Sequence, residues 1–178
     1  YFDGALIATN QYSGSFSAIK NGARFRLGRS VVDEEPFFDG QLAEARVWKV
    51  ARTEAQVRQT MFQRLIGSEA GLAALWNFDD VAAYSGGAAT RLDADGVVKD
   101  SGPGAHHGKL IGSAKALAGD TPASLAPARI SKVLELDGKG SYVELPTSAF
   151  TNLDEVTVEG WVKWESFKAY SRLFDFTF

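Results

Sequence analysis

The stretch that decides the fold is Gln41-Leu42-Ala43-Glu44-Ala45-Arg46-Val47-Trp48-Lys49-Val50. Successive side chains of a β-strand point to opposite faces, so the alternation in this stretch separates two sets of residues. One face carries Leu42, Glu44, Arg46 and Trp48, and the other carries Ala43, Ala45 and Val47. A face of small apolar side chains can press closely against a facing sheet. We therefore predict a strand over 41–50 that belongs to a β-sandwich.

Similar short apolar runs recur on both sides of this stretch, between clusters of Gly, Asn, Asp and Ser. Alternation with period 2 between turn-forming clusters is typical of antiparallel all-β proteins. The further expected strands are 5–9, 23–28, 72–78, 133–136, 142–145, 156–164 and 172–178. In 156–164, one face carries Val156, Val158, Val162 and Trp164. The segments 79–95 and 116–128 are expected to be loops.

One segment departs from the β pattern. Thr53 and Gln56 have the spacing of a capping box, and Val57, Met61 and Leu65 then recur at helical intervals. We expect a helix from Glu54 to Leu65 with Gly67 as its stop signal. Because so short a helix is unstable alone in water, its apolar stripe must lie against the sheets.

Charge and composition exclude several classes of function. The 19 Lys and Arg against 22 Asp and Glu give a net charge of −3, which supplies no strong basic field for nucleic acid or an anionic membrane. No run of 18 uncharged apolar residues is present, so no membrane span is expected. The chain contains no Cys, which excludes thiol nucleophiles and Cys-based zinc sites.

Several segments together resemble a known family. Residues 38–53, the expected helix and residues 67–78 resemble the closing strand, cover helix and next opening strand of laminin-G-like, concanavalin A-like jelly-roll domains. Further resemblance lies in 1–7, 100–112, 134–138, 142–145 and 156–162. The resemblance implies an all-β, antiparallel jelly-roll β-sandwich with one short cover helix at about 54–65.

The order of these segments is unusual for the family. Residues 1–70 resemble the C-terminal half of a laminin-G-like jelly roll, and 71–178 resemble the N-terminal half. The second half belongs either to the next jelly roll of a tandem-repeat array or to the same domain in permuted order. Unpaired backbone groups and a bare apolar face would destabilise such an incomplete sandwich. We therefore expect a neighbouring repeat or copy to complete it.

Catalytic signals are weak. The hydrolytic signature of the superfamily, Glu-x-Asp-x-x-Glu, does not occur in the chain. The nearest acidic groupings, Asp33-Glu34-Glu35 and Glu155 with Glu159, are expected to be solvated charges. His106 and His107 are adjacent, so in an extended chain they point to opposite sides and do not share a metal. We predict no catalytic residue and no enzyme activity.

Calcium is the candidate cofactor, because oxygen ligands on turns suit it and the resemblance includes lectins that bind it. Asp93, Asp95 and Asp100 cluster around Gly96, and Asp79 follows an expected strand. These four aspartates are the predicted metal ligands, with Asp80 nearby.

The predicted ligand-binding residues are Trp164, Phe167 and Tyr170, which are interleaved with Glu165, Ser166 and Lys168. Exposed aromatic rings with polar neighbours are what sugar binding requires. Trp48, Trp76 and Trp161 lie in regular strands and are expected to be buried.

These observations favour a noncatalytic, lectin-type recognition or adhesion module of a repetitive extracellular or cell-surface protein, with calcium as its candidate stabilising ion. Its expected partner is a glycan or a surface protein. Two alternatives remain: an ancillary carbohydrate-binding domain of a secreted glycoside-active enzyme, and a purely structural repeat of a surface filament.

Overall fold

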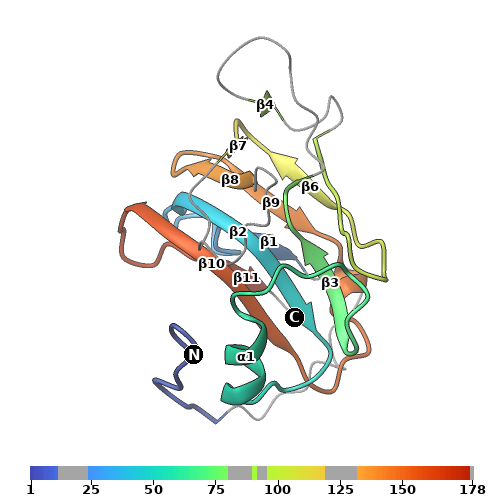
Figure 1. Cartoon of the computed structure of the whole chain (residues 1–178). Coiled ribbons are helices and arrows are strands. Elements are labelled where there is room, and N and C mark those ends of the chain that lie inside the picture. Colours follow the sequence, from blue (N-terminus) through green and yellow to red (C-terminus); the bar gives the residue numbers. More distant parts are fainter. Residues whose placement is uncertain (12–23, 80–89, 92–95, 119–131, 177–178) are drawn as a thin grey trace.

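Two antiparallel sheets face each other in the computed structural model, which describes residues 1–11, 24–79, 90–91, 96–118 and 132–176 (Figure 1). The first sheet has the strand order β11 (Phe174–Phe176), β1 (Phe25–Leu27), β9 (Tyr142–Leu145), β6 (Gly108–Ile111), β5 (Val97–Val98). The second has the order β10 (Thr157–Ser166), β2 (Asp39–Trp48), β8 (Lys132–Asp137), β7 (Lys115–Ala118), β4 (Thr90–Arg91). In addition, β3 (Leu72–Trp76) pairs with the end of β2. The fold class expected from the sequence is confirmed.

The core lies between the sheets and is rich in aromatic side chains. Phe25 is fully buried and stacks on Phe150, with ring centroids 4.1 Å apart, and on Phe176 at 5.8 Å. Phe150 follows the short 3-10 helix η3 (Thr147–Ala149). Trp48 and Trp76 are also buried, as predicted, but Trp161 is only half-buried, so the expectation for Trp161 was wrong. Burial of large aromatic surfaces is a main source of stability in such a sandwich.

Strands from both expected halves of the chain lie side by side in each sheet. β1 lies between β9 and β11, and β2 lies between β8 and β10. The described strands therefore form one sandwich in which 1–70 and 71–178 interleave. The identification of these segments with the C-terminal and N-terminal halves of jelly rolls stays a prediction.

The strand predicted over 41–50 is confirmed by β2, but the assignment of its faces was wrong. Leu42 belongs to the core together with Ala45 and Val47, although strict alternation would separate Leu42 from them. The pairing with β10 slips by one residue near Glu44, which has φ of +53°. A bulge of this kind moves the residues beyond it to the opposite face.

The helix is shorter than predicted. α1 spans Glu54–Thr60, and its capping box is formed as expected: the Gln56 N–H donates to Thr53 Oγ1, and the Thr53 N–H donates to Gln56 Oε1. Arg46 on β2 donates to the carbonyls of Thr60 and Gln63. The Thr60 carbonyl also accepts from the Gln63 N–H, so the chain ends α1 in a tight turn that Arg46 holds through both carbonyls. Val57 and Leu65 are still buried as the predicted stripe requires.

Residues 5–9 do not form the predicted strand. The N-terminal segment makes one bridge, between Phe2 and Ala5, and Leu6 and Ile7 are exposed. The segment is held instead by α1, since Arg58 Nε donates to the Gly4 carbonyl. Figure 1 shows the N-terminus and α1 at the same end of the molecule.

β9 has the predicted bounds, and β1, β3, β8, β10 and β11 are present with shifted ends. Residues 177–178 of the last one lie outside the described part of the chain. The segments 79–95 and 116–128 are not loops throughout, since β4 and most of β7 lie in them. β10 and β11 end their respective sheets on the same flank of the sandwich. That flank carries the predicted aromatic site.

Candidate functional site

The structure places two of the three predicted aromatic residues in contact. Trp164 lies near the end of β10, and Phe167 follows that strand directly, with their ring centroids 6.1 Å apart. The exposed fraction is 40 % for Trp164 and 80 % for Phe167. The buried Phe38 ring meets Trp164 edge-on at 5.7 Å, so one side of the indole is anchored in the core. The pair offers a fixed apolar surface to solvent.

Tyr170 lies on the same connection between β10 and β11. It is 72 % exposed and its backbone has φ of +66°. Among the described residues, no ring contact joins it to Trp164 or Phe167. The predicted cluster is therefore a contacting pair with a third exposed ring further along the loop.

Polar contacts fix the loop that carries these rings. Ser166 Oγ donates to Asp39 Oδ2 at 2.6 Å, and Lys168 Nζ donates to the Gly138 carbonyl. Arg172 donates to Glu35, and hydrogen bonding from Arg172 holds the pKa of Glu35 below its ordinary value. The connection is thus tied to the start of β2, to the β8–β9 turn and to the loop before β2.

An apolar groove of about 660 Å³ runs along β10 next to the aromatic pair. Its inner wall is formed by core-facing residues of both sheets: Leu27, Leu42, Val158, Val162, Leu173 and Phe174. Its other wall is formed by the N-terminal segment, α1 and the outer face of β10. Val158 is 37 % exposed although it points to the interior side of the sheet. The flank between β10 and β11 is therefore open.

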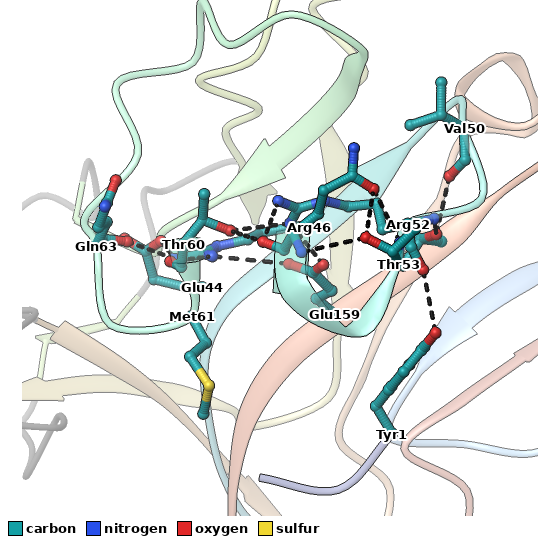
Figure 2. Close-up of polar contacts among 12 residues, drawn as sticks. Tyr1, Glu44, Arg46, Val50, Arg52, Thr53, Thr60, Met61, Gln63 and Glu159 are labelled. Carbon is teal, nitrogen blue, oxygen red and sulfur yellow. Dashed lines mark hydrogen bonds and ion pairs between the residues drawn. The ribbon is translucent and has the colours of Figure 1, made fainter. Parts of the chain in front are cut away.

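A buried ion network lies under α1 on the outer face of β2 and β10 (Figure 2). Arg46, with a side chain only 2 % exposed, donates to Glu44 at 2.8 Å and lies 3.7 Å from Glu159. Glu159 in turn accepts from Arg52 at 2.7 Å, and the Arg52 guanidinium lies over the Trp48 ring. Two acidic and two basic side chains thus balance in charge. Buried charges require such pairing.

Sequence reasoning missed this network. Glu44 and Arg46 could have been predicted to form an ion pair, because residues two apart on a strand share a face. Glu159 was noted only with Glu155 as a solvated charge. Its carboxylate is in fact largely buried, and the expectation for Glu159 was wrong. Glu155 behaves differently, since it is exposed and accepts from the Ala51 N–H.

Two of the remaining acidic residues considered for catalysis, Asp33 and Glu35, also have structural partners. Asp33 pairs with Arg29 at 2.8 Å, and Glu35 pairs with Arg172. Arg29 also lies over the rings of Phe37 and Tyr142. These contacts explain how the loop after β1 is held against the sheet.

The two histidines point to different partners. His106 Nδ1 lies 3.0 Å from Ser148 Oγ, and burial lowers the pKa of His106. His107 Nδ1 accepts from the Asp100 N–H. Both interactions link the loop before β6 to its surroundings.

The predicted calcium ligands that the structure describes are occupied by protein donors. The buried Asp100 accepts from the N–H groups of Leu75, Gly102 and His106. Asp79 accepts from the Lys132 N–H and pairs with Arg64. Neither carboxylate presents free oxygens for an ion, and in the described ranges no three His, Cys, Asp or Glu side chains form a metal-binding group.

Asp93 and Asp95 lie outside the described residues. Asp79 and Asp100 alone do not fit a calcium cage, which takes six to eight oxygen ligands. The calcium site stays a prediction.

No helix within the described ranges has the length and apolarity to span a bilayer. Comparison with curated proteins and with solved structures found no match. Comparison with protein families found one: residues 1–58 match the laminin G model described as the concanavalin A-like lectin/glucanases superfamily. The matched range contains all of β1 and β2 and residues 54–58 of α1. Over residues 1–58, about a third of its length, the chain is therefore similar to the concanavalin A-like lectin/glucanases superfamily.

Proposed function

We propose that the protein is a noncatalytic, lectin-type recognition module that binds glycan through the exposed rings of Trp164 and Phe167, with Tyr170 as an outlying contact. The single observation that carries the proposal is the contact between Trp164 and Phe167 on an open surface. A group of exposed aromatic side chains is unusual on a protein surface unless a ligand or partner binds there.

The chemistry of the surface suits a sugar. The C–H faces of a pyranose ring are apolar, whereas its rim carries hydroxyl groups, so it needs flat rings beside polar groups. Glu165 and Lys168, which follow Trp164 and Phe167 respectively in the chain, are exposed polar residues of the same connection. Because Phe38 anchors the Trp164 indole, little side-chain entropy would be lost on binding.

The superfamily match over residues 1–58 supports a carbohydrate-binding or adhesion role in general terms. An extracellular or cell-surface location belongs to the same proposal. The carboxylates of Asp33, Glu35 and Glu159 are each held by arginine, which supports a role without catalysis.

Binding to a panel of soluble polysaccharides, measured by affinity electrophoresis, tests the proposal. We expect Trp164→Ala and Phe167→Ala each to weaken binding by about tenfold, which is the usual effect of removing an aromatic anchor. Phe62→Ala is the matched control, since Phe62 is 46 % exposed and stacks near Trp161 on the helix side of β10. Unchanged binding by both variants would exclude the aromatic pair.

A further inference from the structure

The apolar groove beside β10 has the size and the lining of a small-molecule site. Its volume of about 660 Å³ lies within the roughly 300–1,000 Å³ of ligand pockets in proteins. Five of the residues that line it are aromatic: Tyr1, Phe2, Trp161, Trp164 and Phe174. An apolar molecule in the groove would remove this surface from water, which is favourable.

The charged side chains in the groove favour an uncharged ligand. Asp3 is exposed to solvent. The other charged residues of the lining, Glu44, Arg46 and Glu159, belong to the buried ion network. With Arg52 this network balances two acidic against two basic side chains. Since these charges already satisfy one another, none is left to compensate an ionised ligand, and burying an uncompensated charge is costly.

Part of the outer wall of the groove is a small hairpin, formed by residues 1–6 and called here the N-terminal hairpin. The Phe2 N–H donates to the Ala5 carbonyl and the Ala5 N–H donates to the Phe2 carbonyl, both at 2.9 Å. Asp3 and Gly4 have φ of +48° and +73°, and a type I′ turn requires positive φ at both of its central residues. The hairpin is therefore a compact unit that can move as a whole.

Few contacts hold the N-terminal hairpin in place. None of the described strands pairs with it, and Tyr1 and Phe2 are 50 % and 60 % exposed. Among the described residues, three hydrogen bonds attach it: from the Tyr1 hydroxyl to the Arg52 carbonyl (Figure 2), from Arg58 Nε to the Gly4 carbonyl, and from the Leu6 N–H to Glu54 Oε2. A segment with few buried contacts opens at a low cost in free energy.

We propose that the groove binds an uncharged apolar small molecule and that the N-terminal hairpin is the lid that controls its entry. In the structure the hairpin lines the groove opposite β10, so its displacement widens the entrance. A ligand that needs the open form binds more weakly in proportion to how rarely the lid is open. This inference does not depend on the proposed glycan binding.

Fluorescence titration of the 1–178 chain with N-phenylnaphthylamine, an uncharged apolar dye, tests the site. We expect saturable binding. Val158→Lys places a charge in the wall of the groove and should weaken binding by about tenfold. Val32→Lys is the matched control, because Val32 is 48 % exposed and does not line the groove. Absence of binding, or equal affinities of the two variants, would overturn the site.

Gly4→Val tests the lid. A Cβ at Gly4 would lie 2.8 Å from both Arg58 Cγ and Met61 Sδ, and a β-branched residue is strained at a φ of +73°. We expect the hairpin to detach and the dye to bind about tenfold more tightly, because lid opening no longer lowers the apparent affinity. Gly140→Val is the control, since a Cβ there meets no atom within 4 Å. Equal affinities of these two variants would overturn the lid.

A reversible lock makes the test of the lid independent of how Gly4→Val folds. The Cβ at residue 4 lies close enough to the Arg58 side chain for the double variant Gly4→Cys, Arg58→Cys to form a disulfide, and the chain contains no other Cys. Oxidation fixes the hairpin to α1, whereas reduction releases it without its Arg58 donor. Reduction should therefore raise the dye affinity roughly tenfold. The same affinity before and after reduction would contradict the lid.

Discussion

At the scale of single residues, Arg46 joins β2 to β10 and to the end of α1. It is buried on β2, pairs with Glu44 and Glu159, and donates to the carbonyls of Thr60, the last residue of α1, and of Gln63 beyond it (Figure 2). A buried ion pair is not stabilising in itself, since desolvation opposes the attraction. Removing one member is costly, however, because the partner charges stay buried alone.

We predict that Arg46→Met destabilises the fold by about 3–5 kcal/mol, because Glu44 stays buried without its donor and the Gln63 carbonyl also loses its donor. Urea denaturation followed by tryptophan fluorescence measures the change. The double variant Glu44→Gln, Arg46→Met should lose less than Arg46→Met alone. Arg58→Met is the control: its pair with Glu54 is about half exposed, so the cost should be below about 1 kcal/mol. Equal costs for Arg46 and Arg58 would show that the network is not buried in solution.

Asp137, the last residue of β8, accepts several hydrogen bonds at the turn that leads to β9. Burial alone would raise its pKa, but hydrogen bonds from Ser141, the Lys139 N–H and Ser113 together hold the pKa well below its ordinary 3.8. A carboxyl whose pKa is lower in the folded state stabilises the fold above its unfolded pKa. That contribution declines as the pH falls from 3.8 toward the folded-state value.

We predict that Asp137→Asn costs about 1–2 kcal/mol at neutral pH, after allowance for solvent screening. The stability difference between the variant and wild type should shrink as the pH is lowered below 3.8. The carboxylate of the unfolded wild-type chain is protonated first, and that of the folded protein only at lower pH. Thermal unfolding of both proteins across this pH range measures it. A difference that is independent of pH would show that packing of the turn, and not the charge, carries the effect.

At the scale of elements, the sequence predicted most strands and the helix but not their faces and ends. Period-2 patterns are local, so β2, β8, β9 and β10 could be recognised. The bulge at Glu44 arises from pairing with β10, more than 100 residues away in the chain, and no local pattern carries that information. The end of α1 likewise depends on Arg46, which lies on another element.

The capping box of α1 was predictable because all its atoms lie within four residues. We predict that Thr53→Ala destabilises the fold by about 1 kcal/mol, since the Gln56 N–H loses its acceptor. Thr53→Ser keeps the hydroxyl and should lose much less. Chemical denaturation of the two variants checks this, and equal losses would mean that the Thr53 methyl group matters instead of its oxygen.

The candidate site, too, could be predicted from the sequence only in part. Trp164, Phe167 and Tyr170 are close in sequence, so their proximity could be expected, and the contact between Trp164 and Phe167 is present. The anchoring by Phe38 and the groove shared by β10 and Phe174 depend on distant segments. Sequence alone could therefore identify the rings but not the open flank beside them.

At the scale of the whole molecule, each sheet joins early and late segments of the chain. β1 pairs on one side with β9 and on the other with β11. The register matches Phe25 with Leu145 and with Phe176, so neither neighbour of β1 is near it in sequence. Such a topology has a high contact order, which slows folding.

This position of β1 matters during synthesis on the ribosome. When residues 25–27 leave the exit tunnel, neither of their sheet neighbours has yet been translated. At about 5–20 residues per second, β1 waits on the order of ten seconds for its first partner strand. Phe25, which is fully buried in the finished core, therefore stays exposed to chaperones in the interval.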